Sequence, residues 1–207
     1  MACFLNGMAL HGGIIPVCGT FFVFSDYMKP AFRMSALMRQ QVIYVWTHDA
    51  FRVGEDGPTH QPVEHELQVR LMEALKNHKG KNSMLVLRPA DVDETTVAWK
   101  MALENQDTPT ALILSRQNVK NLPRKESKYN EALGATKGAY IVKDCEGTAD
   151  VILLASGSEV STLVAATVLL ESRANLNVRI VSVPSEGLFF SQPESYIRSV
   201  IDYNLPI

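Results

Sequence analysis

The chain has 207 residues, of which 46% are hydrophobic and 20% charged, a composition typical of a globular protein with one large or two small domains. Its formal net charge of −2 argues against nucleic acid or an anionic membrane as a partner. No apolar run reaches the roughly 20 residues of a membrane span, and the apolar start lacks the basic flank of a signal peptide. The three cysteines have no metal-like spacing, so we expect reduced thiols in a cytoplasmic protein.

In the first part of the chain, short apolar runs alternate with helical patterns. Continuous runs rich in β-branched and aromatic residues predict strands within 13–24, at 41–47 and at 110–116. Apolar residues at helical spacing predict helices at 27–40 and 91–106, and the second of these opens with acids, as a helix N-terminus prefers. The alternation predicts an α/β fold with a mainly parallel sheet and flanking helices.

A second, partial α/β domain is predicted after a charged stretch at residues 119–137. The predicted division is a first domain at 1–122, a linker at 123–137 and a partial second domain at 138–207. Strand-like runs in the second domain lie at 138–144, 149–157 and 177–185. The turn of Gly157 and Ser158 before its helix has free N–H groups that could hold an anion. Its glycine spacing is not that of a phosphate loop, however, so helix capping is the favoured interpretation.

Aromatic, imidazole and guanidinium groups follow the predicted strands of the first domain. His48 directly follows the second strand, and Arg116 lies at the end of the third. The aromatic residues that end or follow the first strand are Phe21, Phe24 and Tyr27. Ligand sites in open parallel sheets gather beyond the carboxyl ends of the strands, so we expect these side chains to share one rim.

The stretch HDAFRVGEDGPTHQPVEHE, residues 48–66, adds further candidates to this rim. Asp56 and His60 flank a Gly-Pro pair that enforces a turn. A histidine near a carboxylate can exchange protons near neutral pH. The planar guanidinium of Arg116 suits a phosphate or a carboxylate, and the phenylalanines offer a flat apolar surface to an aromatic ring.

Each of these candidates has a structural alternative. His60 could simply cap its loop, and Arg116 could pair with Asp91 or with another surface acid. Phe21 and Phe24 could belong to the hydrophobic core. A metal site is also conceivable, but the spacings fit no standard metal pattern, so we predict none. Its ligands would be His48, Asp56, His60 and His65.

Several segments together resemble the transketolase family. Those that resemble its middle, pyrimidine-binding domain are NGMALHGGIIPVCGTFFVFSDYMKPAFRMSALM, THDAFRVGEDGPTHQPVEHE, LRPAD, AWKMALEN and TPTALILSRQN. YIVKD and LLASGSEV resemble the start of its C-terminal domain, so the match covers nearly the whole chain in order. The related deoxyxylulose-phosphate synthases share a D-G-P-T-H core, but Glu55, the pair Gln61-Pro62 and the run SRQN after the third strand favour transketolase.

The resemblance implies an enzyme of the pentose phosphate pathway that moves a two-carbon ketol unit between sugar phosphates. It implies thiamine diphosphate as the cofactor, held with a divalent cation such as Mg²⁺. It also implies that an aromatic wall surrounds the aminopyrimidine ring of this cofactor, with Phe21 stacking on the ring and Phe24 and Tyr27 beside it.

The resemblance further implies two sets of substrate contacts. Asp56 and His60 would contact the hydroxyls of the donor ketose, with His60 as a catalytic residue. His48 and Arg116 would bind the sugar phosphate. These roles agree with the proton-exchanging pair and the anion-binding group that the residues themselves suggest.

The resemblance leaves part of the family's machinery outside the chain. The family's activating glutamate would fall before Met1, and the N-terminal domain that binds the diphosphate and its metal has no counterpart here. We therefore expect a piece of a transketolase, truncated at both ends and inactive alone, that forms a homodimer or needs an N-terminal-domain partner chain. The alternatives are a subunit of a split transketolase and a non-catalytic interaction module.

Overall fold

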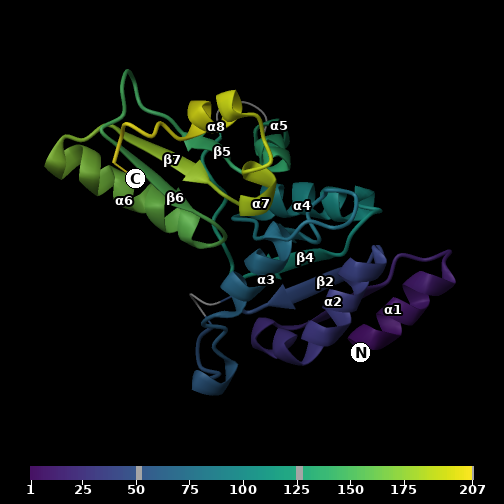
Figure 1. Ribbon diagram of the computed structural model, residues 1–207. Helices are drawn as coiled ribbons and strands as arrows, with labels where there is room; N and C mark the ends of the chain where they lie inside the picture. The colour runs from purple at the N-terminus through teal and green to yellow at the C-terminus, as the bar shows by residue number, and fades with distance from the viewer. Residues whose placement is uncertain (50–52, 125–127, 207) are drawn as a thin grey trace. The chain divides into compact units, whose positions relative to one another are not determined.

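A computed structural model describes residues 1–49, 53–124 and 128–206 of the chain. These residues divide into two compact units, each built around a sheet of its own (Figure 1). One unit consists of Met1–Leu87 with Ala98–Asn118, and the other of Arg88–Val97 with Val119–Ile207. The segment Arg88–Val97 of the second unit therefore lies, in the sequence, between the two segments of the first unit.

Among the described residues, the sheet of the first unit has four strands, all paired in parallel. The strands are β1 (Val17–Phe21), β2 (Ile43–Thr47), β3 (Leu85–Leu87) and β4 (Thr110–Leu114), in the spatial order β1-β2-β4-β3. The runs IYVWT and TALIL form β2 and β4 because β-branched and aromatic residues suit strands that are covered on both faces. The prediction of a mainly parallel sheet with flanking helices is confirmed.

Helices cover both faces of this sheet. Over one face lie α1 (Ala2–His11), a 3₁₀ helix (Phe22–Met28), α2 (Lys29–Met38) and α3 (His65–Ala74), and over the other lies the part of α4 (Val92–Glu104) from Ala98 onward. Successive strand residues point to opposite faces of a sheet. Tyr44 and Trp46 therefore pack with Phe32 of α2, whereas Ile43 packs with Ala98 of α4.

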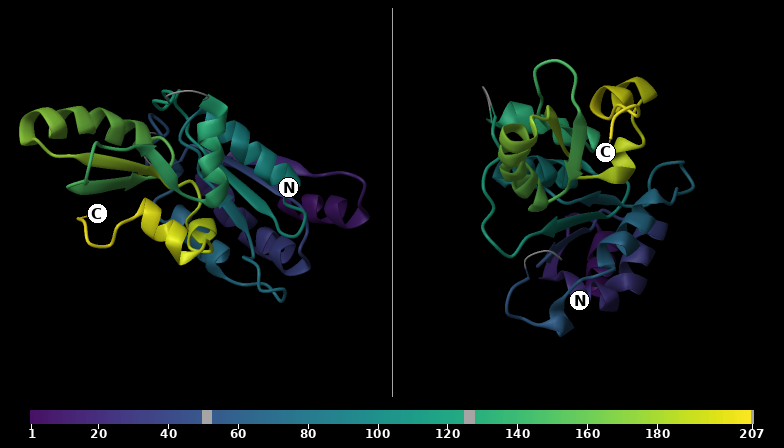
Figure 2. Two further views of the ribbon diagram at one scale, coloured as in Figure 1. Left: turned by 90° about the horizontal axis from the view of Figure 1, so that it is seen from above. Right: turned by 90° about the vertical axis from the view of Figure 1, so that its left-hand side faces the viewer.

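The sheet of the second unit has three strands in the described part of the chain. These are β5 (Tyr140–Lys143), β6 (Val151–Ala155) and β7 (Val178–Ser182), with β7 central, antiparallel to β5 and parallel to β6. The long helix α6 (Glu159–Ala174) packs along one face of this sheet, and the short helices α7 (Glu186–Phe189) and α8 (Glu194–Val200) cover the other (Figure 2).

The stretch predicted as a linker contains helical structure. Lys128–Ala132 forms α5, and Leu133–Lys137 forms a 3₁₀ helix. Ala132 and Ala135 are buried, so this part of the stretch packs against the rest of the unit. Residues 125–127 of the predicted linker lie outside the described residues. Across the described residues, the helices are too short or too polar to cross a membrane.

A buried network of charged groups fixes the start of α4 within the second unit. Arg124 forms an ion pair with Asp91, and the two side chains are only 3% and 0% exposed. Asp91 also accepts a hydrogen bond from the backbone N–H of Glu94 at 2.9 Å and so caps the first turn of α4. Glu94 in turn accepts hydrogen bonds of 2.8 Å from the backbone N–H of Ala90 and from the hydroxyl of Tyr140.

Burial and hydrogen bonding move the pKa values of the two carboxyls in opposite directions. Burial alone would raise the pKa of Asp91, but hydrogen bonds from Arg124 and from the backbone of Glu94 and Leu122 hold it below its usual value. Burial raises the pKa of Glu94 above its usual value. Because the folded pKa of Asp91 is lowered, its contribution to stability is present at neutral pH and is lost as the pH falls through that value.

Replacing Asp91 with Asn should destabilise the second unit by about 3–5 kcal/mol, because the buried guanidinium of Arg124 would lose its fully buried counter-charge and keep only Asp93, whose side chain is 19% exposed. Urea unfolding followed by circular dichroism measures the free-energy change. The matched control is Asp144→Asn. Asp144 pairs with Arg179 but is 47% exposed, so its loss should change stability by no more than about 1 kcal/mol. Equal losses of stability in the two variants would show that the buried pair stabilises the unit no more than the exposed pair does.

Candidate functional site

The carboxyl ends of β1, β2 and β4 form one continuous edge of the first sheet. The parallel register pairs Phe21, the last residue of β1, with Thr47, and Thr47 with Leu114 of β4. His48 follows Thr47 directly, and Arg116 lies two residues beyond Leu114. Three of the residues singled out in the sequence therefore leave the sheet at the same edge.

Five rings gather at this edge, and we call them the aromatic cluster: Phe21, Phe24, Tyr27, His48 and His60. Phe21 stacks on His48 with ring centroids 3.8 Å apart, and Phe24 lies nearly parallel to Phe21 at 6.1 Å. His60 turns its edge toward Phe21 and Phe24, at 5.7 and 5.3 Å. Tyr27 extends the cluster from Phe24 at 6.2 Å and is 85% exposed.

Asp56 lies between the two basic groups at the edge. Its Oδ2 atom is 3.8 Å from Nε of Arg116 and 4.0 Å from Nε2 of His48. Both distances are longer than a hydrogen bond, and no described residue makes a hydrogen bond to this oxygen. These contacts are therefore purely electrostatic, and the guanidinium N–H groups of Arg116, whose side chain is 41% exposed, remain available to an anion.

Left-handed backbone conformations shape the edge at two positions. His48 has a φ of 64°, which is uncommon for a residue other than glycine, and Oγ1 of Thr47 lies 3.0 Å from its Nδ1. Gly54 has a φ of 87°, and a Cβ atom added there would come within 3.0 Å of Nη1 of Arg116. The contact between Gly54 and Arg116 was not predicted, although a second glycine three residues before Gly57 was a visible signal of a tightly turned loop.

The structure decides two of the alternatives weighed from the sequence. Phe21 and Phe24 are half-buried side chains at the sheet edge rather than core residues. Arg116 does not pair with Asp91, which pairs within the second unit, but it does lie beside another acid, Asp56, as the alternative allowed. Residues 50–52 of the histidine-rich stretch lie outside the described residues.

His65 lies in a different environment from the aromatic cluster. It is buried against Phe22, with Nε2 at 3.0 Å from Asp26 and Nδ1 at 3.8 Å from Glu64. Within the described ranges, Asp26, Glu64 and His65 are the one group of side chains close enough together to ligate a metal ion, so the four-residue metal group considered from the sequence does not form there. Lys29 already pairs with Asp26 at 2.6 Å, and we assign no metal to this group.

Comparison with known proteins places the chain in a family. Residues 1–121 match the family model for "Transketolase, pyrimidine binding domain". The chain belongs to the transketolase family. Residues 138–207 match the model for "Transketolase-like TK C-terminal domain", so the resemblance carried by the sequence motifs is confirmed for both family domains.

Individual transketolases are similar to the chain over nearly all of its residues. The transketolase of Halalkalibacterium halodurans is 49% identical over 202 residues, and that of Aquifex aeolicus is 46% identical over 201. Each match covers 97% of this chain but only 28% and 27% of the two relatives. The structure of transketolase from Leishmania mexicana superposes with a TM-score of 0.85 at 43% identity, covering 99% of this chain and 28% of the other.

A more distant structure shares the fold alone. It is a chain of a split-gene transketolase in its inactive β4 tetramer, with a TM-score of 0.66 at 24% identity, and the match covers 88% of this chain and 53% of that one. Against its curated relatives, by contrast, the chain spans little more than a quarter of their length.

Gly54→Ala should displace the guanidinium of Arg116, because the added Cβ would come within 3.0 Å of Nη1. It should also cost about 1–2 kcal/mol of stability, since alanine disfavours the left-handed region. The matched control is Gly80→Ala, because Gly80 has a φ of 74° and open space around its Cβ position. Both variants should lose similar stability in urea, but only Gly54→Ala should shift the Nε–H signal of Arg116 in NMR spectra of isotope-labelled protein. A signal that stays in place in both variants would disprove the contact.

Proposed function

We propose that these residues form the pyrimidine-binding side of the active site of a thiamine-diphosphate-dependent transketolase. In this function the whole protein transfers a two-carbon ketol unit between sugar phosphates. The observation that carries the proposal is the sheet edge at which the aromatic cluster, Asp56 and Arg116 meet, in a chain that belongs to this family. Because the chain spans about 28% of a curated relative, we attribute the activity to the whole protein and not to these 207 residues alone.

The aromatic cluster fits the aminopyrimidine ring of thiamine diphosphate in shape and polarity. Phe21 and Phe24 are half-buried and offer flat apolar faces, and the exposed Tyr27 would border the ring. His48 covers one face of Phe21 at 3.8 Å, so the cofactor ring would stack on the opposite face or displace the imidazole. Thiamine diphosphate, when bound, supplies the carbon nucleophile that takes up the two-carbon unit. Its diphosphate and a divalent cation such as Mg²⁺ would be held by parts of the protein outside this chain.

The polar groups of the edge suit a sugar phosphate. Arg116 and His48 would bind the phosphate, since a guanidinium and an imidazole can both donate hydrogen bonds to its oxygens. Asp56 and His60 would contact the hydroxyls of the donor. Oγ1 of Thr59 lies 2.9 Å from Nδ1 of His60, which leaves Nε2 to accept or return the proton of a substrate hydroxyl.

In full-length protein, Arg116→Gln should lower kcat/KM for xylulose 5-phosphate by roughly 10- to 100-fold, because a hydrogen bond to a charged group contributes about 1.5–3 kcal/mol. Turnover of hydroxypyruvate, which has no phosphate, should change little. His60→Ala should impair both donors, since contacts to hydroxyls do not depend on the phosphate. The matched control is Arg173→Gln, an exposed arginine at the end of α6 that should leave both donors unaffected. An equal loss for both donors in Arg116→Gln would refute the assignment of the phosphate to this residue.

The chain also exposes apolar surface that a partner would cover. On α1, Phe4, Met8 and Leu10 are 77%, 44% and 59% exposed. Monomeric proteins seldom expose contiguous apolar patches of this kind. We infer that a second copy, or a chain that carries the rest of a transketolase, packs on α1. The second arrangement has a parallel in the split-gene transketolase whose chain shares this fold.

The purified 207-residue chain should self-associate and show no ketol transfer when thiamine diphosphate and Mg²⁺ are added. Light scattering at about 10 µM, which corresponds to roughly −7 kcal/mol of association, measures its mass. Leu10→Glu should weaken the association, whereas Leu169→Glu, at a similarly exposed position on α6, should not. Turnover by the chain alone, or a clean monomer that also fails to bind an N-terminal half, would contradict this. Adding a purified N-terminal half distinguishes a split enzyme, which regains activity, from an interaction module, which binds without activity.

We also propose the domain division into 1–122, a linker at 123–137 and 138–207, together with a cytoplasmic location. The family matches at 1–121 and 138–207 support the division. Cys3, Cys18 and Cys145 are free thiols, which supports a reducing compartment. The alternative of a deoxyxylulose-phosphate synthase is not retained, because both matched family models are those of transketolases.

A further inference from the structure

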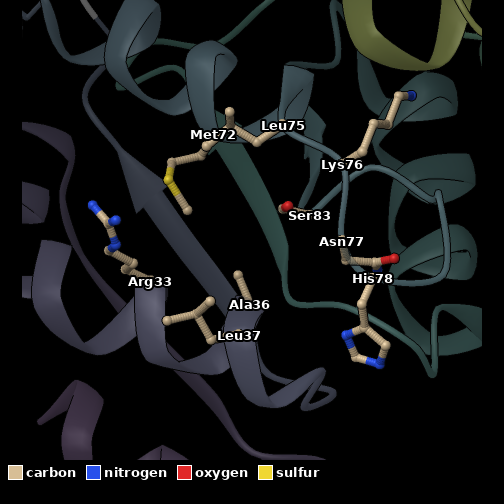
Figure 3. Close-up of a pocket in the computed structure, with 9 residues that line it drawn as sticks. All are labelled: Arg33, Ala36, Leu37, Met72, Leu75, Lys76, Asn77, His78 and Ser83. Carbon is tan, nitrogen blue, oxygen red and sulfur yellow. The ribbon is translucent and has the colours of Figure 1, made fainter.

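A cavity of about 300 Å³ opens in the first unit between α2, α3 and the loop that leads into β3 (Figure 3). Its volume is at the lower end of the range for small-molecule sites. α2 ends at Met38, shortly before β2 begins at Ile43, and the loop ends just before Leu85, where β3 begins. Because the strands are parallel, these points mark the amino edge of the sheet. The cavity is therefore separate from the candidate site at the carboxyl edge.

The lining of this cavity combines an apolar floor with positive charge. Met72 and Leu75 reach toward the space from the end of α3, and Ala36 and Leu37 from α2 (Figure 3). Arg33 lies at one end of the lining, on α2, and further basic side chains belong to the loop. No acidic side chain of the described residues lines it. Such a lining favours a ligand that is apolar in its body and negative at one end.

Arg33 has no counter-charge among the described residues, whereas three other cations of the first unit do. Arg39, Lys79 and Lys81 all pair with Asp107. Arg33, by contrast, forms no ion pair or hydrogen bond with any residue in the described ranges. An unpaired guanidinium beside an apolar cavity retains all its donors for a carboxylate or a phosphate.

The loop wall of the cavity is held in shape by its own hydrogen bonds. The backbone N–H of Asn77 donates to the carbonyl of Lys81 at 2.8 Å, and that of Gly80 donates to the carbonyl of Asn77 at 2.9 Å. Oδ1 of Asn77 accepts the backbone N–H groups of Lys79 and Lys81, at 2.9 and 3.2 Å. The wall is thus already formed, so a ligand would not have to order it on binding.

We propose that this cavity binds a small organic anion, namely a phosphate monoester or a carboxylate with a short apolar chain. Arg33 binds the anionic group, and the chain lies on Met72 and Leu37. The site is independent of the proposed transketolase function, because none of its residues belongs to the carboxyl edge.

Hexyl phosphate is the test ligand, and hexanol and inorganic phosphate are its neutral and chain-free counterparts. Isothermal titration of the 207-residue chain should give binding of hexyl phosphate at least about tenfold tighter than either counterpart. Arg33→Gln should weaken it by about tenfold, since a hydrogen bond to a charged group is lost. The titrations are run in an Arg116→Gln background, so that any binding of the phosphate at the candidate active site is removed and the remaining binding reports on this cavity.

Leu37→Glu gives a second, independent variant that should leave folding intact, because Leu37 is 64% exposed. The added carboxylate should repel the ligand and weaken binding by more than about tenfold. Its matched control is Met34→Glu, at an exposed position on the same helix outside the lining, which should leave binding within about twofold. The proposal is overturned if the Arg116→Gln chain does not bind hexyl phosphate, if hexanol binds equally well, or if neither Arg33→Gln nor Leu37→Glu weakens binding.

Discussion

The parallel register of β1, β2 and β4 is the constraint on which the rest of the first unit depends. Phe21 pairs with Thr47, and Thr47 with Leu114, so the chain leaves all three strands at the same level. A slip of one residue would turn every side chain of a strand to the opposite face, so Tyr44 and Trp46, which are fully buried against Phe32, would be forced into the space that Ile43 fills beside α4. The packing of the core thus fixes the register, and the register brings the functional side chains together.

Sequence patterns predicted the elements that have a clear period or a continuous apolar run, such as β2, β4, α2 and α4. α1 was missed because its sequence, ACFLNGMALH, is apolar on almost every side and gives no amphipathic signal. α3 was missed because it begins inside a polar loop, and β3 because three residues carry too little pattern. In each case packing against the sheet, rather than local preference, determines the structure.

The candidate site was predictable in its position but not in its contacts. His48 and Arg116 follow predicted strands, so their common edge follows from the rule for parallel sheets. The left-handed conformation of His48, its stacking on Phe21 and the approach of Gly54 to Arg116 depend on how a loop closes over that edge. Loop conformations of this kind arise from tertiary contacts between residues distant in sequence, and a single sequence does not encode them in any local pattern.

Asp56 lies beside Arg116 and His48, the two groups proposed to bind phosphate, and its negative charge would repel a phosphate. The interaction energies indicate that this obstacle is small. The contacts of Asp56 with Arg116 and His48, at 3.8 and 4.0 Å between partly exposed groups, contribute about 0–1 kcal/mol. Hydrogen bonds from a guanidinium to a phosphate contribute more, about 1.5–3 kcal/mol. In the proposed function a phosphate would therefore replace Asp56 as the partner of Arg116 at little cost in free energy. The released carboxylate, whose Oδ2 has no hydrogen bond to any described residue, is then free to accept one from a substrate hydroxyl. In the proposed function, these two weak contacts of Asp56 would hold Arg116 and His48 at the edge until a ligand that carries both a phosphate and a hydroxyl replaced them.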